Sequence, residues 1–186
     1  MGRIATVCTK CDLRRRYLLV VSGETREMIF VILGTQKFQL NRLLKTLDQY
    51  VEQGVIKDKI IAQIGYSDYL PKRYEYVEFL NKEEFDAMIQ KADVVISHSG
   101  VGSIISALNA KKPVIVYPRL AKYREHIDDH QTEIAYAFSK KKYVLSCNEE
   151  DDLLELLDKC KTFPFATYVS QREKIVEIIS EFLKKN

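Results

Sequence analysis

One stretch near the middle of the chain decides the expected fold, and it runs Val94-Val95-Ile96-Ser97-His98-Ser99-Gly100-Val101-Gly102-Ser103. Residues 94–97 are apolar or small, and they predict a short buried strand. Two glycines follow with one residue between them, and a helix is expected to begin near Gly102. A buried strand that passes through a glycine turn into a helix is typical of a parallel α/β sheet.

The same alternation continues in both directions from this stretch. Apolar, β-branched runs predict further strands, and apolar residues at helical spacing predict the helices between them. We expect strands at 28–33, 59–64, 76–80, 94–97, 113–117 and 143–145, and helices at about 40–51, 82–91, 102–109, 129–139, 149–160 and 168–184. This pattern predicts a Rossmann-like α/β fold, a doubly wound parallel sheet whose ligands bind at the carboxyl ends of the strands.

The chain length fits one such domain. Its 186 residues are enough for one α/β domain with a substantial core, and we expect that domain to cover residues 28–186. Residues 1–27 differ, because Arg14, Arg15 and Arg16 lie beside an apolar stretch and a polar run follows. An extension, an upstream-start artefact and a membrane-surface arm all remain open for this segment.

Composition and charge exclude several classes of protein. Hydrophobic residues make up 46% and charged residues 30% of the chain, as in globular proteins. The net charge is +3, from 29 basic and 26 acidic residues, which argues against a dedicated nucleic-acid binder. No segment reaches the roughly 18 apolar residues that a membrane span requires. We therefore expect a soluble protein that needs another component to hold it at any membrane.

The four cysteines do not form a metal-site pattern. Cys8 and Cys11 make a single C-x-x-C pair, and Cys147 and Cys160 lie far from it in sequence. A structural zinc site needs a second closely spaced ligand pair. Free thiols in a reducing cytosol are the expected state.

The glycine turn after residues 94–97 is the first candidate site. Gly100 and Gly102 allow the backbone to approach a ligand closely, and the helix that follows offers free N–H groups and its positive dipole end. Ser103 adds a hydroxyl, and the ring of His98 could donate to phosphate oxygens. These groups suit a diphosphate. The alternative is a tight strand-to-helix turn in which His98 has only a capping role.

The second candidate site is the polar segment 125–133, which follows the expected strand at 113–117. Its dense hydrogen-bonding groups suit a sugar, because each sugar hydroxyl needs a donor or an acceptor. It can equally be a helix N-terminus, with Asp128 or Asp129 as its cap and Glu133 in the first turn. Its histidines also permit a metal site, but no regular ligand spacing supports one.

A third candidate is the turn Gly34-Thr35 after the first strand. If the strand order brings it near the glycine turn, it could approach the phosphates from the other side. An ordinary turn between a strand and a helix is the alternative.

Four segments taken together resemble a known family. Residues 28–36, 97–103, 112–119 and 125–131 resemble, in this order, the carboxyl-terminal domain of glycosyltransferase family 28. By pattern, the chain is similar to short one-domain members. These include the catalytic subunit of the eukaryotic dolichol-linked N-acetylglucosamine transferase and the bacterial PssE-type exopolysaccharide and capsule glycosyltransferases. The resemblance covers roughly residues 28–180.

The resemblance implies one half of a GT-B enzyme, the half that binds a UDP-sugar. In the short members, a second, membrane-associated polypeptide binds the lipid-linked sugar acceptor. The resemblance therefore places the protein in the cytoplasm, at the inner face of the membrane through that heterodimer partner. It implies inverting transfer of a hexosyl group without an obligatory metal or other cofactor, and no nucleic-acid partner.

The resemblance also assigns residues. His98, Gly100, Gly102 and Ser103 would face the diphosphate. His130 and Gln131 would face the donor sugar, with Asp129 in the same polar segment. Many relatives carry a glutamate three residues after the serine of the glycine turn, where it holds the ribose. This chain has Ser106 there, so either the nucleoside is held differently or Glu133 contributes from the next helix.

The functional expectation is a UDP-sugar-dependent transferase subunit for a lipid-linked capsule polysaccharide or exopolysaccharide. Transfer of β-1,4-linked galactose to a lipid-linked glucose is the expected case, by analogy. An N-acetylglucosaminyltransferase subunit and a non-catalytic nucleotide-sugar-binding module are the alternatives. A sugar-nucleotide epimerase of the same fold is disfavoured, because such enzymes normally carry both halves in one chain. No general base is evident, and it is expected on the partner.

Overall fold

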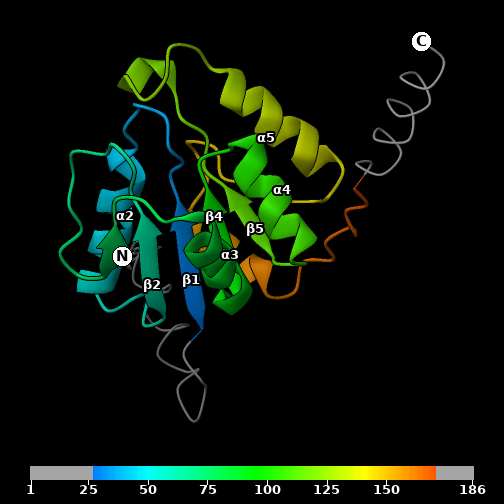
Figure 1. Ribbon diagram of the computed structural model, residues 1–186, viewed down its shortest axis with the longest axis horizontal. Helices are drawn as coiled ribbons and strands as arrows, with labels where there is room; N and C mark the ends of the chain where they lie inside the picture. The colour runs from blue at the N-terminus through cyan, green and yellow to red at the C-terminus, as the bar shows by residue number, and fades with distance from the viewer. Residues whose placement is uncertain (1–26, 171–186) are drawn as a thin grey trace, which may run out of the picture.

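The computed structural model describes residues 27–170, and within them the chain forms a parallel sheet between two layers of helices (Figure 1). The sheet has six strands in this part of the chain, in the order β3-β2-β1-β4-β5-β6. All neighbouring strands pair in parallel. The strands are β1 Met28–Ile32, β2 Lys59–Gln63, β3 Glu75–Val77, β4 Val94–Ser97, β5 Val114–Val116 and β6 Leu145–Ser146. The expected doubly wound parallel fold is confirmed.

Alternate residues of the strands face opposite helix layers. Ile29 and Val31 of β1 pack in the core that contains the buried leucines of α2 and α6, whereas Phe30 and Ile32 pack in the core with α3, α4 and α5. This alternation follows from the two-residue period of a strand. The helices are α2 Asn41–Glu52, α3 Lys82–Lys91, α4 Val101–Asn109, α5 His130–Lys140 and α6 Leu153–Cys160, with a short 3₁₀ turn at Ala121–Tyr123.

The strand order reverses between β1 and β4, which are adjacent in the centre of the sheet. Ile32 lies opposite Ser97 in their parallel register, so the loops that follow the two strands leave the sheet side by side. A crevice at such a switch point is where open α/β sheets bind ligands. The expected site segments after these strands are therefore neighbours in space.

Several expected boundaries were wrong, for local reasons. The strand expected at 76–80 is β3, which ends at Val77. The chain then turns, and Asn81 caps α3. The Asn81 side chain accepts a hydrogen bond from Glu84 N, and the Glu84 carboxylate accepts one from Asn81 N. The helix expected from 149 begins only at Leu153, because the Asp152 side chain caps it by accepting from Leu154 N. The strand expected at 143–145 is β6, Leu145–Ser146.

Parts of the chain lie outside the described residues. These include residues 1–26 of the expected extension, with Cys8 and Cys11, and the expected final helix from 171 onward. Residues 168–170, where that helix was expected to begin, are not helical. Cys147 and Cys160 are buried free thiols, as expected. Among the described helices, none is long and apolar enough to cross a membrane.

A buried carboxylate holds the long connection between β2 and β3. Asp48 of α2 is only 5% exposed. Its oxygens accept the hydroxyl of Tyr69 at 2.6 Å and the backbone N–H groups of Lys72 and Arg73, each at 2.9 Å. These bonds hold residues 69–73 against α2, and residues 69–73 do not form a helix themselves. Asp48 is therefore a main anchor of this connection, together with the bonds from Tyr69 N to Asn41 and from the Tyr74 hydroxyl to Leu44 O.

We expect Asp48→Ala to lower the free energy of unfolding by about 1–3 kcal/mol, because it leaves three partly buried donors without their acceptor. Urea unfolding measures this as a lower midpoint at an unchanged slope. The matched control is Glu52→Ala on the same helix. Glu52 pairs with Arg73, and both side chains are more than half exposed, so the loss should stay below about 0.5 kcal/mol. Equal losses in the two variants would contradict the anchoring role.

Candidate functional site

The candidate site lies at the carboxyl ends of β1, β4 and β5, where three loops meet. These are residues 33–40 after β1, residues 98–100 after β4 and residues 117–129 after β5. Contacts between Gly34 and His98 join the first two loops, and hydrogen bonds from Arg119 to Leu33 and Phe38 join the first and the third. Gly34 and the glycine turn are thus brought together, and the exposed Thr35 follows Gly34.

The ring of His98 fills the space between two glycines. A Cβ at Gly34 would lie 2.6 Å from His98 Cε1, and a Cβ at Gly100 would lie 2.4 Å from His98 Nε2. Real Cβ atoms do not approach other atoms this closely, so any side chain at either position would displace the ring. Gly34 also has a φ of +75°, which favours glycine. Packing alone therefore explains these two glycines.

His98 is neutral in this position. Burial, and after it the charge of Arg119, lower its pKa to about 4 against an opposing effect of the Ile32 carbonyl. That carbonyl lies 3.0 Å from His98 Nδ1 and can only accept, so Nδ1 carries the proton and Nε2 a lone pair. The expected donation from His98 to a phosphate therefore requires the ring to take up a second proton.

The start of α4 is open to a ligand. Gly100 is its N-cap residue and provides no side-chain cap, and the first helical bond runs from Ile104 N to Gly100 O. The amides of residues 101–103 precede that bond and lie at the positive end of the helix dipole. A Cβ on Gly102 would meet no atom of residues 27–170 within 4 Å. Packing does not explain this glycine, whereas a ligand close to the backbone would.

Several buried polar atoms at the same edge have no partner within residues 27–170. They are the hydroxyl oxygens of Ser97 and Ser99 and the Nη1 atom of Arg119. Ser99 also has a φ of +69°, which is uncommon for a residue other than glycine. Buried polar groups are nearly always satisfied, and strained backbone often occurs at functional sites. Both features single out this edge of the sheet.

Gln131, expected to face the sugar, is buried at the start of α5. Its side-chain oxygen accepts from Arg119 N at 3.1 Å, so only its amide NH₂ group remains as a donor. His130 and Glu133 are mostly exposed, and their side chains lie 3.4 Å apart.

Asp129 is the N-cap residue of α5, but its carboxylate does not cap the helix. It accepts instead from Ala121 N at 2.8 Å. The Asp128 carboxylate provides the capping hydrogen bond instead, by accepting from His130 N at 3.1 Å. Within the described residues, no three histidine, cysteine or acidic side chains gather to hold a metal ion. The absence of a metal requirement stays a prediction.

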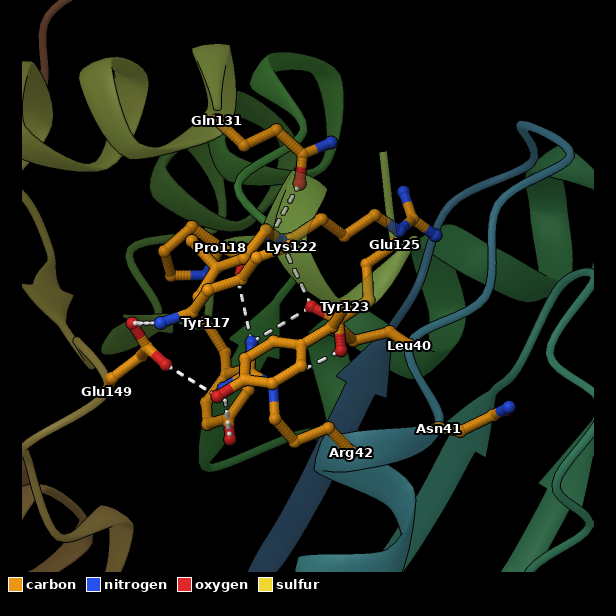
Figure 2. A network of polar contacts seen from close by, with 12 residues as sticks. Leu40, Asn41, Arg42, Tyr117, Pro118, Lys122, Tyr123, Glu125, Gln131 and Glu149 are labelled. Atoms are coloured by element: carbon orange, nitrogen blue, oxygen red, sulfur yellow. Dashed lines mark hydrogen bonds and ion pairs between the residues drawn. The ribbon is translucent and has the colours of Figure 1, made fainter. Parts of the chain in front are cut away.

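An arginine that the sequence did not single out fixes the loop after β5 (Figure 2). Arg42 of α2 makes a two-pronged pair with Glu125, with Nε at 3.2 Å from Oε1 and Nη2 at 3.0 Å from Oε2. It also donates to the hydroxyl of Tyr117 and the carbonyl of Pro118, and it lies over the rings of Tyr117 and Tyr123. Glu125 is 1% exposed and accepts from Leu120 N as well.

The rim of this loop is tied down in a second place. Glu149 accepts the hydroxyl of Tyr123 at 2.7 Å and pairs with Lys122 at 2.5 Å (Figure 2). These contacts hold the loop against α2 and against the turn before α6. The loop that leads into α5, where the expected sugar-facing residues His130 and Gln131 begin the helix, is therefore held at two places.

The chain is similar in sequence to curated transferases of two kinds. The chain is 39% identical over 79 residues to UDP-N-acetylglucosamine transferase subunit ALG13 of Cryptococcus neoformans var. neoformans serotype D, across 41% of this chain and 36% of that protein. It is 28% identical over 179 residues to the UDP-N-acetylglucosamine--N-acetylmuramyl-(pentapeptide) pyrophosphoryl-undecaprenol N-acetylglucosamine transferase of Clostridium kluyveri, across 89% of this chain and 47% of that protein. The chain thus spans less than half the length of either relative.

A solved structure and a family profile complete the comparison. The solution structure of ALG13 superposes with a TM-score of 0.53 at 20% identity, covering 82% of this chain and 94% of that one. A likeness at this identity shows the fold alone. The profile of the glycosyltransferase family 28 C-terminal domain matches residues 28–184. With the parallel sheet and the open helix start at its switch point, this match shows that the chain belongs to the glycosyltransferase family 28 C-terminal domain family.

Proposed function

We propose that this chain is the UDP-sugar-binding subunit of an inverting glycosyltransferase. The observation that carries the proposal is the uncapped start of α4 at the switch point between β1 and β4, where Gly102 has open space in front of its Cα. Free amides at a helix start bind phosphate well, because the N–H groups and the dipole act together. The diphosphate of the donor would lie there, with Ser103 in the same turn.

The donor sugar that we propose is N-acetylglucosamine. Both curated relatives are named for transfer of N-acetylglucosamine from its UDP derivative. A shared donor is what a donor-binding domain would preserve. The relatives' names give no support to the expected galactose transfer or to a role in capsule or exopolysaccharide synthesis.

The acceptor would be held by a partner subunit. One relative is named as a transferase subunit, and the name of the other describes a lipid-linked acceptor. We therefore propose a membrane-associated partner that binds a lipid-linked sugar and holds this chain at the cytoplasmic face. His98 is buried and its ring lies between two glycines, so it is poorly placed to reach an acceptor hydroxyl. The general base would then lie on the partner.

The alternative is a nucleotide-sugar-binding module without catalysis. Ser106 stands where many relatives carry the ribose-binding glutamate, and no general base is identified among residues 27–170. Binding without transfer, measured with the partner present, would favour this module.

The first test is a donor screen with membranes that supply the partner and its acceptor. We expect transfer from UDP-N-acetylglucosamine to exceed transfer from UDP-galactose and UDP-glucose by at least about tenfold, because a site that hydrogen-bonds a substituent rejects analogues lacking it. Scintillation counting of extracted lipid measures the product. Calorimetry on the purified chain gives donor binding separately. If no UDP-sugar binds, with or without the partner, the proposal fails.

The second test separates phosphate contacts from sugar contacts. His98→Ala should weaken UDP binding by roughly tenfold, which corresponds to the loss of about 1.4 kcal/mol. Gln131→Ala should leave UDP within about threefold of wild type but change the ratio of affinities for the three UDP-sugars. Asn109→Ala, at the exposed far end of α4, is the control. Equal UDP affinity in wild type and His98→Ala would refute the phosphate contact.

The third test uses the neutral state of His98. Its pKa in the free protein is about 4, and a diphosphate beside Nε2 would raise it, so binding would take up a proton. Because the complex then holds more protons than the free protein, affinity for UDP-N-acetylglucosamine should rise as pH falls from 8 to 6. Calorimetry in buffers of different ionisation enthalpy counts the proton. The same uptake in His98→Ala would assign it to another group.

A further inference from the structure

Arg119 is a buried cation whose side chain hydrogen-bonds only to backbone carbonyls among the residues that the structure describes. The residue is fully buried, at 0% exposure. Nη2 donates to Leu33 O at 2.5 Å and to Phe38 O at 3.0 Å, and Nε donates to Gln39 O at 3.3 Å. All three carbonyls belong to the loop after β1. The side chain thus fixes both ends of the loop that carries the Gly34-Thr35 turn.

Within residues 27–170, no carboxylate contacts the charged group of Arg119. Burial lowers its pKa to about 10, so the guanidinium stays charged at neutral pH. Glu125 acts on it only through space, and Glu125 is itself paired with Arg42. A buried charge is costly unless an opposite charge offsets it. The Nη1 atom moreover has no hydrogen-bond partner in residues 27–170.

The position of Arg119 connects it to all three loops of the candidate site and to the start of α5. Its backbone N–H donates to Gln131, its side chain holds the loop after β1, and its charge acts on His98 after β4. A bound diphosphate at this edge would bring the negative charge that the guanidinium lacks.

We propose that Arg119 is the positioning residue of the donor site, which holds the loop after β1 in its binding conformation and supplies the buried positive charge that offsets a bound diphosphate. This inference rests on the proposed function, because it takes the anion to be the diphosphate of a nucleotide-sugar. It assigns no direct contact with the sugar or the base.

The experiment compares UDP with uridine, which lacks the phosphates. Calorimetry measures UDP binding, and ligand-observed NMR measures uridine binding. Arg119→Met, which removes the charge and the carbonyl bonds, should weaken UDP binding by on the order of 100-fold and leave uridine within about threefold. Arg119→Lys keeps the charge but cannot hold three carbonyls in a planar fork, so it should weaken UDP binding by about tenfold.

The control is Arg124→Met, which removes an exposed arginine of the same loop and should bind both ligands as wild type does. Thermal unfolding confirms that each variant is folded. If Arg119→Met does not fold, Arg119→Lys decides alone. Wild-type UDP affinity in Arg119→Lys, or an equal loss for UDP and uridine in a folded variant, would overturn the role of Arg119. If wild type itself binds no UDP-sugar, the proposed function fails instead.

Discussion

The parallel pairing of β1 with β4 is the constraint on which the rest of the molecule depends. Because the two strands run side by side with Ile32 opposite Ser97, their loops emerge together although more than 60 residues separate them. Helices must then cover the sheet on both faces, and the alternation of Ile29 and Val31 against Phe30 and Ile32 gives each face its own core. The crevice is what remains at the edge where the connections diverge.

Within that crevice, the glycines have different physical roles. Gly34 and Gly100 have no side chain because the ring of His98 occupies the space, whereas Gly102 faces open space at the helix start. A motif of closely spaced glycines therefore contains both a packing requirement and an opening. The structure separates a packing role for Gly34 and Gly100 from the open space at Gly102, and the contacts of all three with a ligand stay a prediction.

Local signals predicted much of the fold. β4 and α3 lie where the sequence placed them, because a short apolar run and apolar residues at helical spacing are patterns within a few neighbouring residues. The third strand was predicted to extend too far, because Phe79 and Leu80 are apolar although the strand ends at Val77. The sequence predicted the turns and helix starts of the candidate site, but not the side chains that hold its loops in place. Arg42 and Glu125 are 83 positions apart, and Arg119 and Leu33 are 86 apart. Such pairs depend on strand order, which no local pattern specifies, although a charged residue three positions after the last residue of a buried strand was a signal for Arg119.

The bond from Arg119 N to the side chain of Gln131 has a consequence for energetics. Gln131 lies at the start of α5, while the side chain of Arg119 reaches across the crevice to Leu33 and Phe38. A ligand group that competes for the side-chain oxygen of Gln131 would therefore disturb Arg119, and through it the backbone of the loop after β1. The start of α5 and the loop after β1 are thus coupled through Arg119. The binding free energies contributed by different parts of one ligand will therefore not be additive.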